Sequence, residues 1–220
     1  MNGCEDKKLL AIDPSLTCTG WALFDLEIGQ LLGVGNIKSI SSSFPLSQRL
    51  VDFQKRVKEV FDSVSIKSGD YLVCEAATTM VDPRATIILE QIRGMFETLA
   101  REREVIVPGR INPRSVQFEI LGMRGVQISR VKVKDVAVHG AECLYGDALK
   151  QLGFDTRLSN LKKNQDIVDA LLVGRLVLTR IQSALQANMP VENIFEEHKR
   201  QTRTSLKKIK GLIHEEQVTD

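Results

Sequence analysis

The chain has 220 residues, of which 43% are hydrophobic and 26% are charged, and its formal net charge is +2. These values are typical of an ordinary globular protein with a buried core, and so small a net charge assigns no partner by itself. The sequence lacks a run of about 18 apolar residues, which excludes a predicted membrane-spanning helix. The first residues do not have the order of a signal peptide, and the cysteines lie far apart. We therefore expect reduced thiols and a cytoplasmic protein, or a protein of the host cytoplasm if the source is a phage or virus.

The first half of the chain opens with a predicted hairpin. Residues 8–13 form an apolar run that ends on Asp13, and residues 19–25 form a second one. Residues 14–20 contain Pro, Ser, Thr and Gly, which suit a tight reversal. Residues 30–40 predict a third strand, weakened by two glycines. From Leu46 the apolar residues recur at helical spacing, which predicts an amphipathic helix.

The rest of the chain alternates between strands and helices. The predicted strands are 71–75, which ends on Glu75, and 104–108. The predicted helices are 84–103, 112–122, 133–152 and 166–185, with connecting segments at 76–83, 123–132 and 155–165. This alternation predicts an α/β sheet flanked by helices. We expect a globular domain over residues 1–188 and a charged, basic C-terminal extension over 189–220.

Four carboxylates occupy positions that suggest chemistry. Asp13 and Glu75 each end an apolar strand, where α/β proteins place active sites. Asp166 and Asp169 are three residues apart and share one face of a predicted helix. Carboxylates that converge repel one another, and Mg²⁺ or Mn²⁺ relieves this repulsion better than zinc does. Two such ions about 4 Å apart support phosphodiester hydrolysis.

Each carboxylate also has a purely structural interpretation. Asp13 alone suits a turn residue that accepts backbone amides. Glu75 alone suits an ion pair with Arg84 or Arg93. Asp166 alone suits a helix N-cap, with a further favourable acidic residue in the first turn. The functional interpretation depends on the order and the spacing of all four residues.

Three stretches together resemble the RuvC-type Holliday junction resolvases of the ribonuclease H-like superfamily. They are residues 9–21 (LLAIDPSLTCTGW), residues 72–75 (LVCE) and residues 166–171 (DIVDAL), and residues 89–94 (LEQIRG) resemble the family's helix after its glutamate, where a glycine-containing segment packs closely. The resemblance covers about residues 8–182. Two departures are visible: no aromatic residue closely follows Glu75, and Ser15 stands where many members have glycine.

The resemblance implies a fold, a reaction and a set of metal ligands. The fold would be α/β and ribonuclease H-like, with a five-stranded mixed sheet flanked by helices on both sides. Asp13, Glu75, Asp166 and Asp169 would be the catalytic, metal-binding residues and would hold two Mg²⁺ ions, for which Mn²⁺ would substitute. The protein would be a homodimeric endonuclease of DNA recombination and repair that resolves four-way junctions or other branched DNA.

Basic residues near such a site would contact DNA phosphates. The candidates follow Glu75, precede or open the helix at 133–152, or lie in the segment 155–165: Arg84, Arg124, Arg130, Lys132, Lys134, Lys162 and Lys163. Any one of them is equally a solvated surface residue. The basic residues of the extension suit a DNA-binding element, a partner-binding element or a disordered tail.

Two other functions remain open from the sequence. A non-catalytic module of the same fold would bind branched DNA or a protein partner without cutting. Residues 13–20 also resemble the first phosphate loop of actin-like and sugar-kinase ATPases. Those ATPases usually need two such subdomains and glycine-rich adenosine loops, and this chain lacks such loops. The leading hypothesis is therefore a nuclease.

Overall fold

A five-stranded mixed sheet forms the centre of the molecule, in the strand order β3-β2-β1-β4-β5. The computed structural model describes residues 7–77, 82–123 and 128–195. The strands are β1 (Lys8–Asp13), β2 (Cys18–Asp25), β3 (Leu31–Lys38), β4 (Tyr71–Glu75) and β5 (Arg110–Ile111). The first three are antiparallel neighbours, and β4 runs parallel to both β1 and β5. The predicted five-stranded mixed sheet is confirmed.

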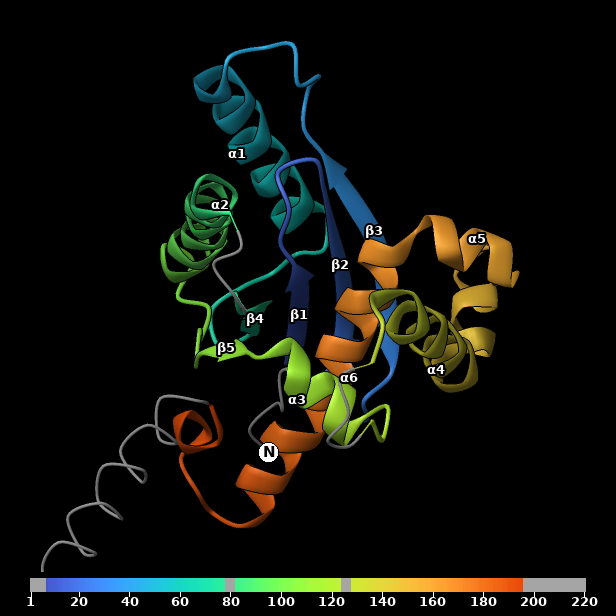
Figure 1. Cartoon of the computed structure of the whole chain (residues 1–220). Helices are drawn as coiled ribbons and strands as arrows, with labels where there is room; N and C mark the ends of the chain where they lie inside the picture. Colours follow the sequence, from blue (N-terminus) through green and yellow to red (C-terminus); the bar gives the residue numbers. More distant parts are fainter. Residues whose placement is uncertain (1–6, 78–81, 124–127, 196–220) are drawn as a thin grey trace, which may run out of the picture.

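Helices cover both faces of this sheet (Figure 1). The helices α1 (Leu46–Ser63) and α2 (Pro83–Arg101) pack on one face, and α4 (Arg130–Gln151) and α6 (Gln165–Gln186) pack on the other. The shorter elements are α3 (Pro113–Glu119), α5 (Leu158–Lys163) and the 3-10 helix η1 (Val191–Ile194). Alternate residues of β1 point to opposite faces: Leu9 joins the core beneath α6, and Leu10 joins the core beneath α1 and α2. A strand covered on both sides is apolar at nearly every position, as β1 is.

The hairpin between β1 and β2 is closed by side chains. The Thr19 hydroxyl donates to the Ser15 carbonyl oxygen at 2.6 Å and accepts from the Ser15 backbone N–H at 2.8 Å. Gly20, which the sequence assigned to the reversal, lies within β2 and faces α6. A Cβ at this position would lie 1.9 Å from the Asp166 carbonyl oxygen, so only glycine lets the start of α6 come so near.

Two predicted elements differ in kind from the observed ones. The strand expected at 104–108 is reduced to a single bridge between Ile106 and Tyr71, and β5 pairs with the end of β4 a few residues later. The segment 155–165, expected as a loop, contains α5. Of the two glycines that weaken β3 as a strand, Gly35 has a packing role, because a Cβ there would lie 2.6 Å from the Trp21 indole.

The chain after α6 returns to the core. Val191 and Phe195 are both buried in the cluster beneath α6, and Phe195 lies against Gly109. The extension predicted from residue 189 therefore begins with a packed turn. The division at 188 and 189 stays a prediction, because residues 196–220 lie outside the described ranges.

Candidate active site

Asp13 and Glu75 lie side by side at the ends of two adjacent parallel strands. Pairing of Ile12 with Cys74 places the next residue of each strand at the same edge of the sheet. The two carboxyl groups are partly buried and lie close enough for each to affect the ionisation of the other. Burial, reinforced by the neighbouring Glu75, Asp169 and Asp166 carboxylates, raises the pKa of Asp13 well above its usual value. Burial also raises the pKa of Glu75, although the hydrogen bond from Asp13 and the charge of Arg93 oppose the rise.

Asp169 approaches the same edge of the sheet from α6. Its position follows from the close packing of α6 on β2, since Gly20 faces the first turn of the helix and Gly174 faces Phe24. Gln165 Nε2 donates to Asp169 Oδ1 at 3.0 Å. Burial and the Glu75 carboxylate raise the pKa of Asp169 to about 7, and the Gln165 hydrogen bond and the Lys134 charge limit the rise. Three of the four predicted carboxylates therefore come together.

Asp166 lies at the margin of this group. Burial and the neighbouring Asp166 carboxylate raise the pKa of the Cys18 thiol to about 11. Asp166 is not the N-cap of α6, because Asn164 holds that position without a side-chain capping bond. Electrostatic repulsion from Asp166 reaches both Asp13 and Asp169. Of the structural alternatives, the helix cap is thus not realised.

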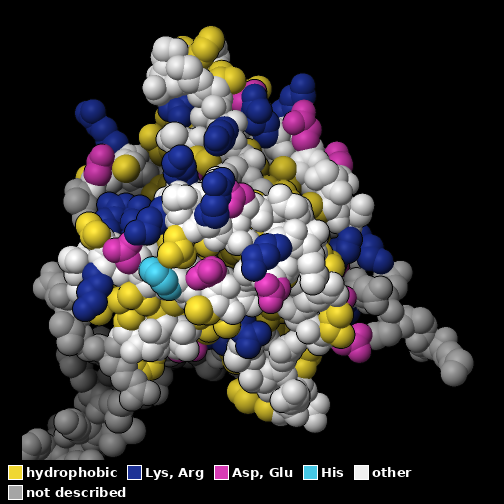
Figure 2. Space-filling model, turned by 90° about the vertical axis from the view of Figure 1, so that its right-hand side faces the viewer, with side chains coloured by type: hydrophobic (Ala, Val, Ile, Leu, Met, Phe, Trp, Pro, Cys, Tyr) yellow, Lys and Arg dark blue, Asp and Glu magenta, His cyan; other side chains and the backbone are white. Residues whose placement is uncertain are grey.

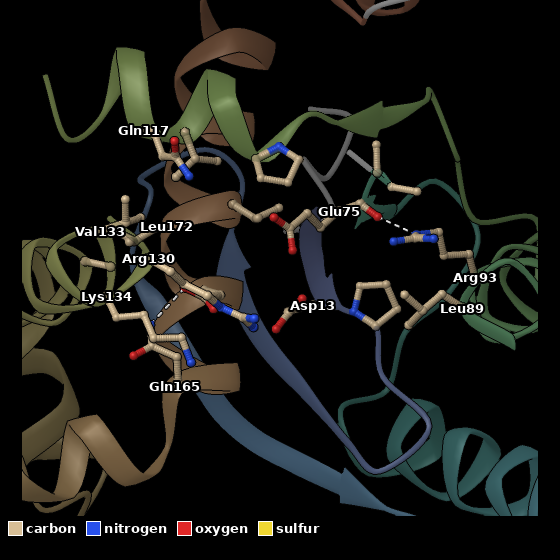
Figure 3. A pocket seen from close by; sticks show the side chains of 18 of the residues that line it. Asp13, Glu75, Leu89, Arg93, Gln117, Arg130, Val133, Lys134, Gln165 and Leu172 are labelled. Atoms are coloured by element: carbon tan, nitrogen blue, oxygen red, sulfur yellow. Dashed lines mark hydrogen bonds between the residues drawn. The ribbon is translucent and has the colours of Figure 1, made fainter. Parts of the chain in front are cut away.

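The carboxylates open onto a cavity of about 660 Å³ (Figure 3). Its walls come from α2, α3, α4 and α6. Arg130 and Lys134 extend into it from the first turns of α4, and Gln117 and Gln165 contribute amide groups. The remaining wall is largely apolar, and it includes Leu89, Val116, Leu121, Val133, Leu172 and Val173. Basic side chains therefore stand on the wall across from the acidic ones.

The chemistry of this donor set fits a hard divalent cation. Carboxylate oxygens are the ligands that Mg²⁺ and Mn²⁺ prefer. Burial raises the pKa values of Asp13, Glu75 and Asp169, and repulsion from neighbouring carboxylates adds to the rise at Asp13 and Asp169, so a bound cation would stabilise their charged forms. Within the described ranges, no three His, Cys, Asp or Glu side chains converge closely enough to hold an ion as they stand.

The predicted basic residues divide into two groups. Arg130 and Lys134 line the cavity, whereas Arg84, Lys132 and Lys163 are exposed residues that do not contribute to its wall. Lys162 is also outside the cavity, and its Nζ lies 2.8 Å from Asp135 Oδ1. On the face formed by α4 and α5, basic and acidic side chains are intermingled (Figure 2). Arg124 lies outside the described residues.

Sequence reasoning did not select two polar residues of the cavity. Gln165 precedes the predicted start of α6 by one residue, and its i,i+4 spacing to Asp169 is a signal that would have identified the contact. Gln117 lies on α3, and no local pattern distinguishes it from a surface glutamine. Sequence reasoning considered Arg93 as a partner for the Glu75 carboxylate. In the structure, Arg93 Nε donates to the Glu75 main-chain oxygen at 2.6 Å.

The strand order and the strand-end carboxylates define the class of protein. It is an α/β protein with the ribonuclease H-like fold, in which a mixed sheet carries acidic residues at the ends of adjacent strands. None of the helices in the described ranges combines the length and the apolar composition that a membrane span requires. No protein-family model matches the chain.

Comparison with known proteins then identifies the relatives. The crossover junction endodeoxyribonuclease RuvC of Erythrobacter litoralis is 25% identical over 157 residues, covering 70% of this chain and 93% of the relative. Thermus thermophilus RuvC in complex with a Holliday junction substrate superposes with a TM-score of 0.55 at 17% identity, covering 82% of this chain and 96% of the other. A further T. thermophilus RuvC structure gives the same TM-score and coverage at 20% identity. The chain is a distant relative of the RuvC-type Holliday junction resolvases.

Proposed function

We propose that the chain is a metal-dependent endonuclease that cuts branched DNA, with the four-way junction as its main substrate. The observation that carries the proposal is the convergence of Asp13, Glu75 and Asp169 opposite Arg130 and Lys134 in one cavity. The two basic residues would attract the phosphodiester anion. The three carboxylates would hold the metal ions that neutralise its charge. The distant relationship to crossover junction endodeoxyribonucleases supports the same reaction.

In this proposal the carboxylates bind the metal, and the basic residues orient the DNA. Asp13, Glu75 and Asp169 would hold Mg²⁺ or Mn²⁺, with Asp166 contributing from the margin. When bound, the ions supply Lewis-acid polarisation for phosphodiester hydrolysis. Gln165 orients Asp169 through its amide hydrogen bond, and Arg130 and Lys134 hold the phosphate backbone at the mouth of the cavity.

The branched substrate and the dimer are also proposals. The T. thermophilus neighbour is described in complex with a Holliday junction, and we propose the same class of substrate here. Symmetric resolution of a four-way junction needs two cuts, one in each of two strands. We therefore propose a homodimer that carries two copies of the cavity, and we expect paired nicks.

Cleavage of a labelled four-way junction tests the proposal. The full chain should make paired nicks near the crossover in Mg²⁺ or Mn²⁺, with much slower cutting of a linear duplex and none in EDTA. Asp13→Asn should reduce the rate by at least about 10³-fold, because it removes a central carboxylate of the site. Asp147→Asn, on an exposed part of α4, serves as the matched control and should cut at the wild-type rate.

Two outcomes would contradict the proposal. Wild-type rates from Asp13→Asn would show that the carboxylate cluster is not the active site. Junction binding without nicks in either metal would instead establish a non-catalytic binding module of the same fold.

A further inference from the structure

Arg93 is a buried charged residue beside the carboxylates. Its side chain is only 4% exposed, and among the described residues only Asp70 and Arg93 are both buried and charged. Burying a guanidinium costs several kcal/mol unless its donors are satisfied. The hydrogen-bond partners of Arg93 therefore show which groups this buried charge holds in place.

The first contact of Arg93 is with the main chain of Glu75. Arg93 Nε donates to the Glu75 carbonyl oxygen at 2.6 Å (Figure 3). Glu75 is the last residue of β4, and the pairing between β4 and β1 ends one residue earlier, at Cys74. On the other side, the Ala76 N–H donates to the Ile111 carbonyl oxygen at 2.7 Å. Arg93 thus fixes the peptide group that follows Glu75 just where the strand stops.

The second contact holds Arg93 itself in place. Arg93 Nη1 donates to Glu90 Oε1 at 2.8 Å, and the other Glu90 oxygen accepts from Arg110 Nη1 at 2.6 Å. Arg110 lies in β5 and also donates through Nε to Glu97 Oε1 at 2.6 Å. Alternating charges therefore tie α2 to β5 and to the end of β4. Such a satisfied network is rigid, because each side chain has lost its rotamer freedom to more than one partner.

We propose that Arg93 is a positioning residue for Glu75, held by Glu90 and Arg110, and that it sets the affinity of the site for divalent metal. The inference rests on the proposed function and assigns a new role within it. Arg93 lines the cavity but makes its hydrogen bonds to the Glu75 main chain and to Glu90. Its planar fork serves both partners at once, which a lysine ammonium does less well.

The test measures metal affinity in the full chain by two readouts. The first is the Mg²⁺ concentration that gives half-maximal single-turnover cleavage of a four-way junction. The second is the free Mn²⁺ concentration that gives half-saturation of the chain in a calorimetric titration, which needs no catalysis. Loss of an outer-shell partner typically weakens metal binding about 10-fold to 100-fold. We expect Arg93→Gln to raise both concentrations at least about 10-fold, and Arg93→Lys and Glu90→Gln to raise them about 3-fold to 10-fold.

The control variant is Arg103→Gln. Arg103 lies after the end of α2, pairs with Asp62 at 2.6 Å and stacks over Phe61, so its loss removes an arginine ion pair far from the cavity. The melting temperature of this variant should fall, while both half-maximal metal concentrations (the metal midpoints) stay at wild-type values. Junction affinity measured in EDTA should be the same for all of these proteins, because Arg93 is only 4% exposed and its hydrogen bonds go to Glu75 and Glu90.

The outcomes separate this inference from the proposed function. If Arg93→Lys and Glu90→Gln both bind Mn²⁺ with wild-type midpoints, Arg93 is not a positioning residue, even if Arg93→Gln fails to fold. If the wild type binds Mn²⁺ but cuts no DNA, the proposed function falls and the Mn²⁺ titration still decides the role of Arg93. If the wild type binds no metal, both proposals are wrong.

Discussion

At the scale of single residues, the candidate site is a group of carboxylates in a partly buried environment that disfavours their charged forms. The pKa values of Asp13, Glu75 and Asp169 are all raised, first of all by burial. Like charges in a desolvated site oppose folding unless a cation neutralises them. The same residues that we propose to bind metal should therefore destabilise the metal-free chain.

Asp169→Asn should stabilise the metal-free protein at pH 8. The pKa of Asp169 is about 7 in the folded chain, against an ordinary value of 3.8. The folded state therefore favours the protonated carboxyl. The stability that the protonated Asp169 carboxyl contributes is fully present below pH about 4 and is lost as the pH rises through about 7. In EDTA at pH 8 we expect the variant to have a free energy of unfolding about 1–2 kcal/mol above wild type, after allowance for solvent screening.

Urea unfolding at pH 5 and at pH 8 checks this expectation. The gain from Asp169→Asn should be smaller at pH 5, where the wild-type carboxyl is mostly protonated. Asp147→Asn, with a side chain 93% exposed, should change stability little at either pH. A variant that is no more stable than wild type at pH 8, or that gains as much at pH 5, would refute the electrostatic account.

At the scale of elements, the packing of α6 on β2 places one half of the site. The helix is buried around most of its circumference, as expected for a central helix. Two glycines let it approach, since a Cβ at Gly174 would lie 2.1 Å from the Phe24 ring and a Cβ at Gly20 would meet the Asp166 main chain. Asp13 pairs with Gly20 across the hairpin. The register between β1 and β2 therefore fixes the positions of both Asp13 and the glycine against which α6 packs.

Gly20→Ala should damage the site more than the fold. The new methyl group must displace backbone atoms of Asp166 and Ile167, and such overpacking costs about 1–3 kcal/mol. Because Asp169 lies in the next residues of the same helix, the displacement should carry its carboxylate away from Glu75. We expect cleavage to fall at least about 100-fold at a temperature where the variant is fully folded.

Gly146→Ala is the matched control for this substitution. Gly146 is a buried glycine in α4, and a Cβ there would meet only Glu142 Cγ, at 3.7 Å. It should retain cleavage and gain about 0.5–1 kcal/mol from the better helix propensity of alanine. Circular dichroism and melting curves would establish folding. Equal activity of both variants would show that the position of α6 is not set by Gly20.

At the scale of the whole molecule, the distribution of charge matters more than its total. The net charge is only +2, and on the face formed by α4 and α5 basic side chains alternate with acidic ones (Figure 2). Arg130 and Lys134 differ because they line the acidic cavity and form no salt bridge among the described residues. An unpaired basic residue is free to replace counterions on DNA, whereas a paired one is already neutralised.

Substitution of the two cavity residues should reduce the salt dependence of junction binding. Each of Arg130→Gln and Lys134→Gln should make the slope of log K against log salt less steep by about 0.9, the value for one lost phosphate contact. Fluorescence anisotropy in EDTA at several salt concentrations measures this slope. Lys162→Gln is the control, because Lys162 is paired with Asp135, and its slope should stay near wild type. A larger change in this slope for Lys162→Gln than for the two cavity variants would indicate that DNA contacts α5 instead.

Much of the architecture was predictable from the sequence because its signals are local. The continuous apolar run at 8–13 and the helical periods from Leu46 and Asp166 depend only on neighbouring residues. Strands that end on carboxylates gave Asp13 and Glu75, and the spacing of three within a helix gave Asp166 and Asp169. These patterns predicted the α/β class, most of its elements and the carboxylates of the candidate site.

Only the tertiary structure decided how those residues meet. The strand predicted at 104–108 lies instead at β5, because its pairing with β4 is a contact between distant segments. The role of Gly20 depends on its contact with α6, a helix almost 150 residues later in the chain. The same holds for Arg93, whose partners lie on α2 and at the end of β4, and for the choice of Arg130 and Lys134 among the basic residues. Periodicity encodes which face of an element is buried, because it repeats along the chain. Close approach, ion pairing and burial of polar groups are set by whatever lies across the interface, which no local pattern contains.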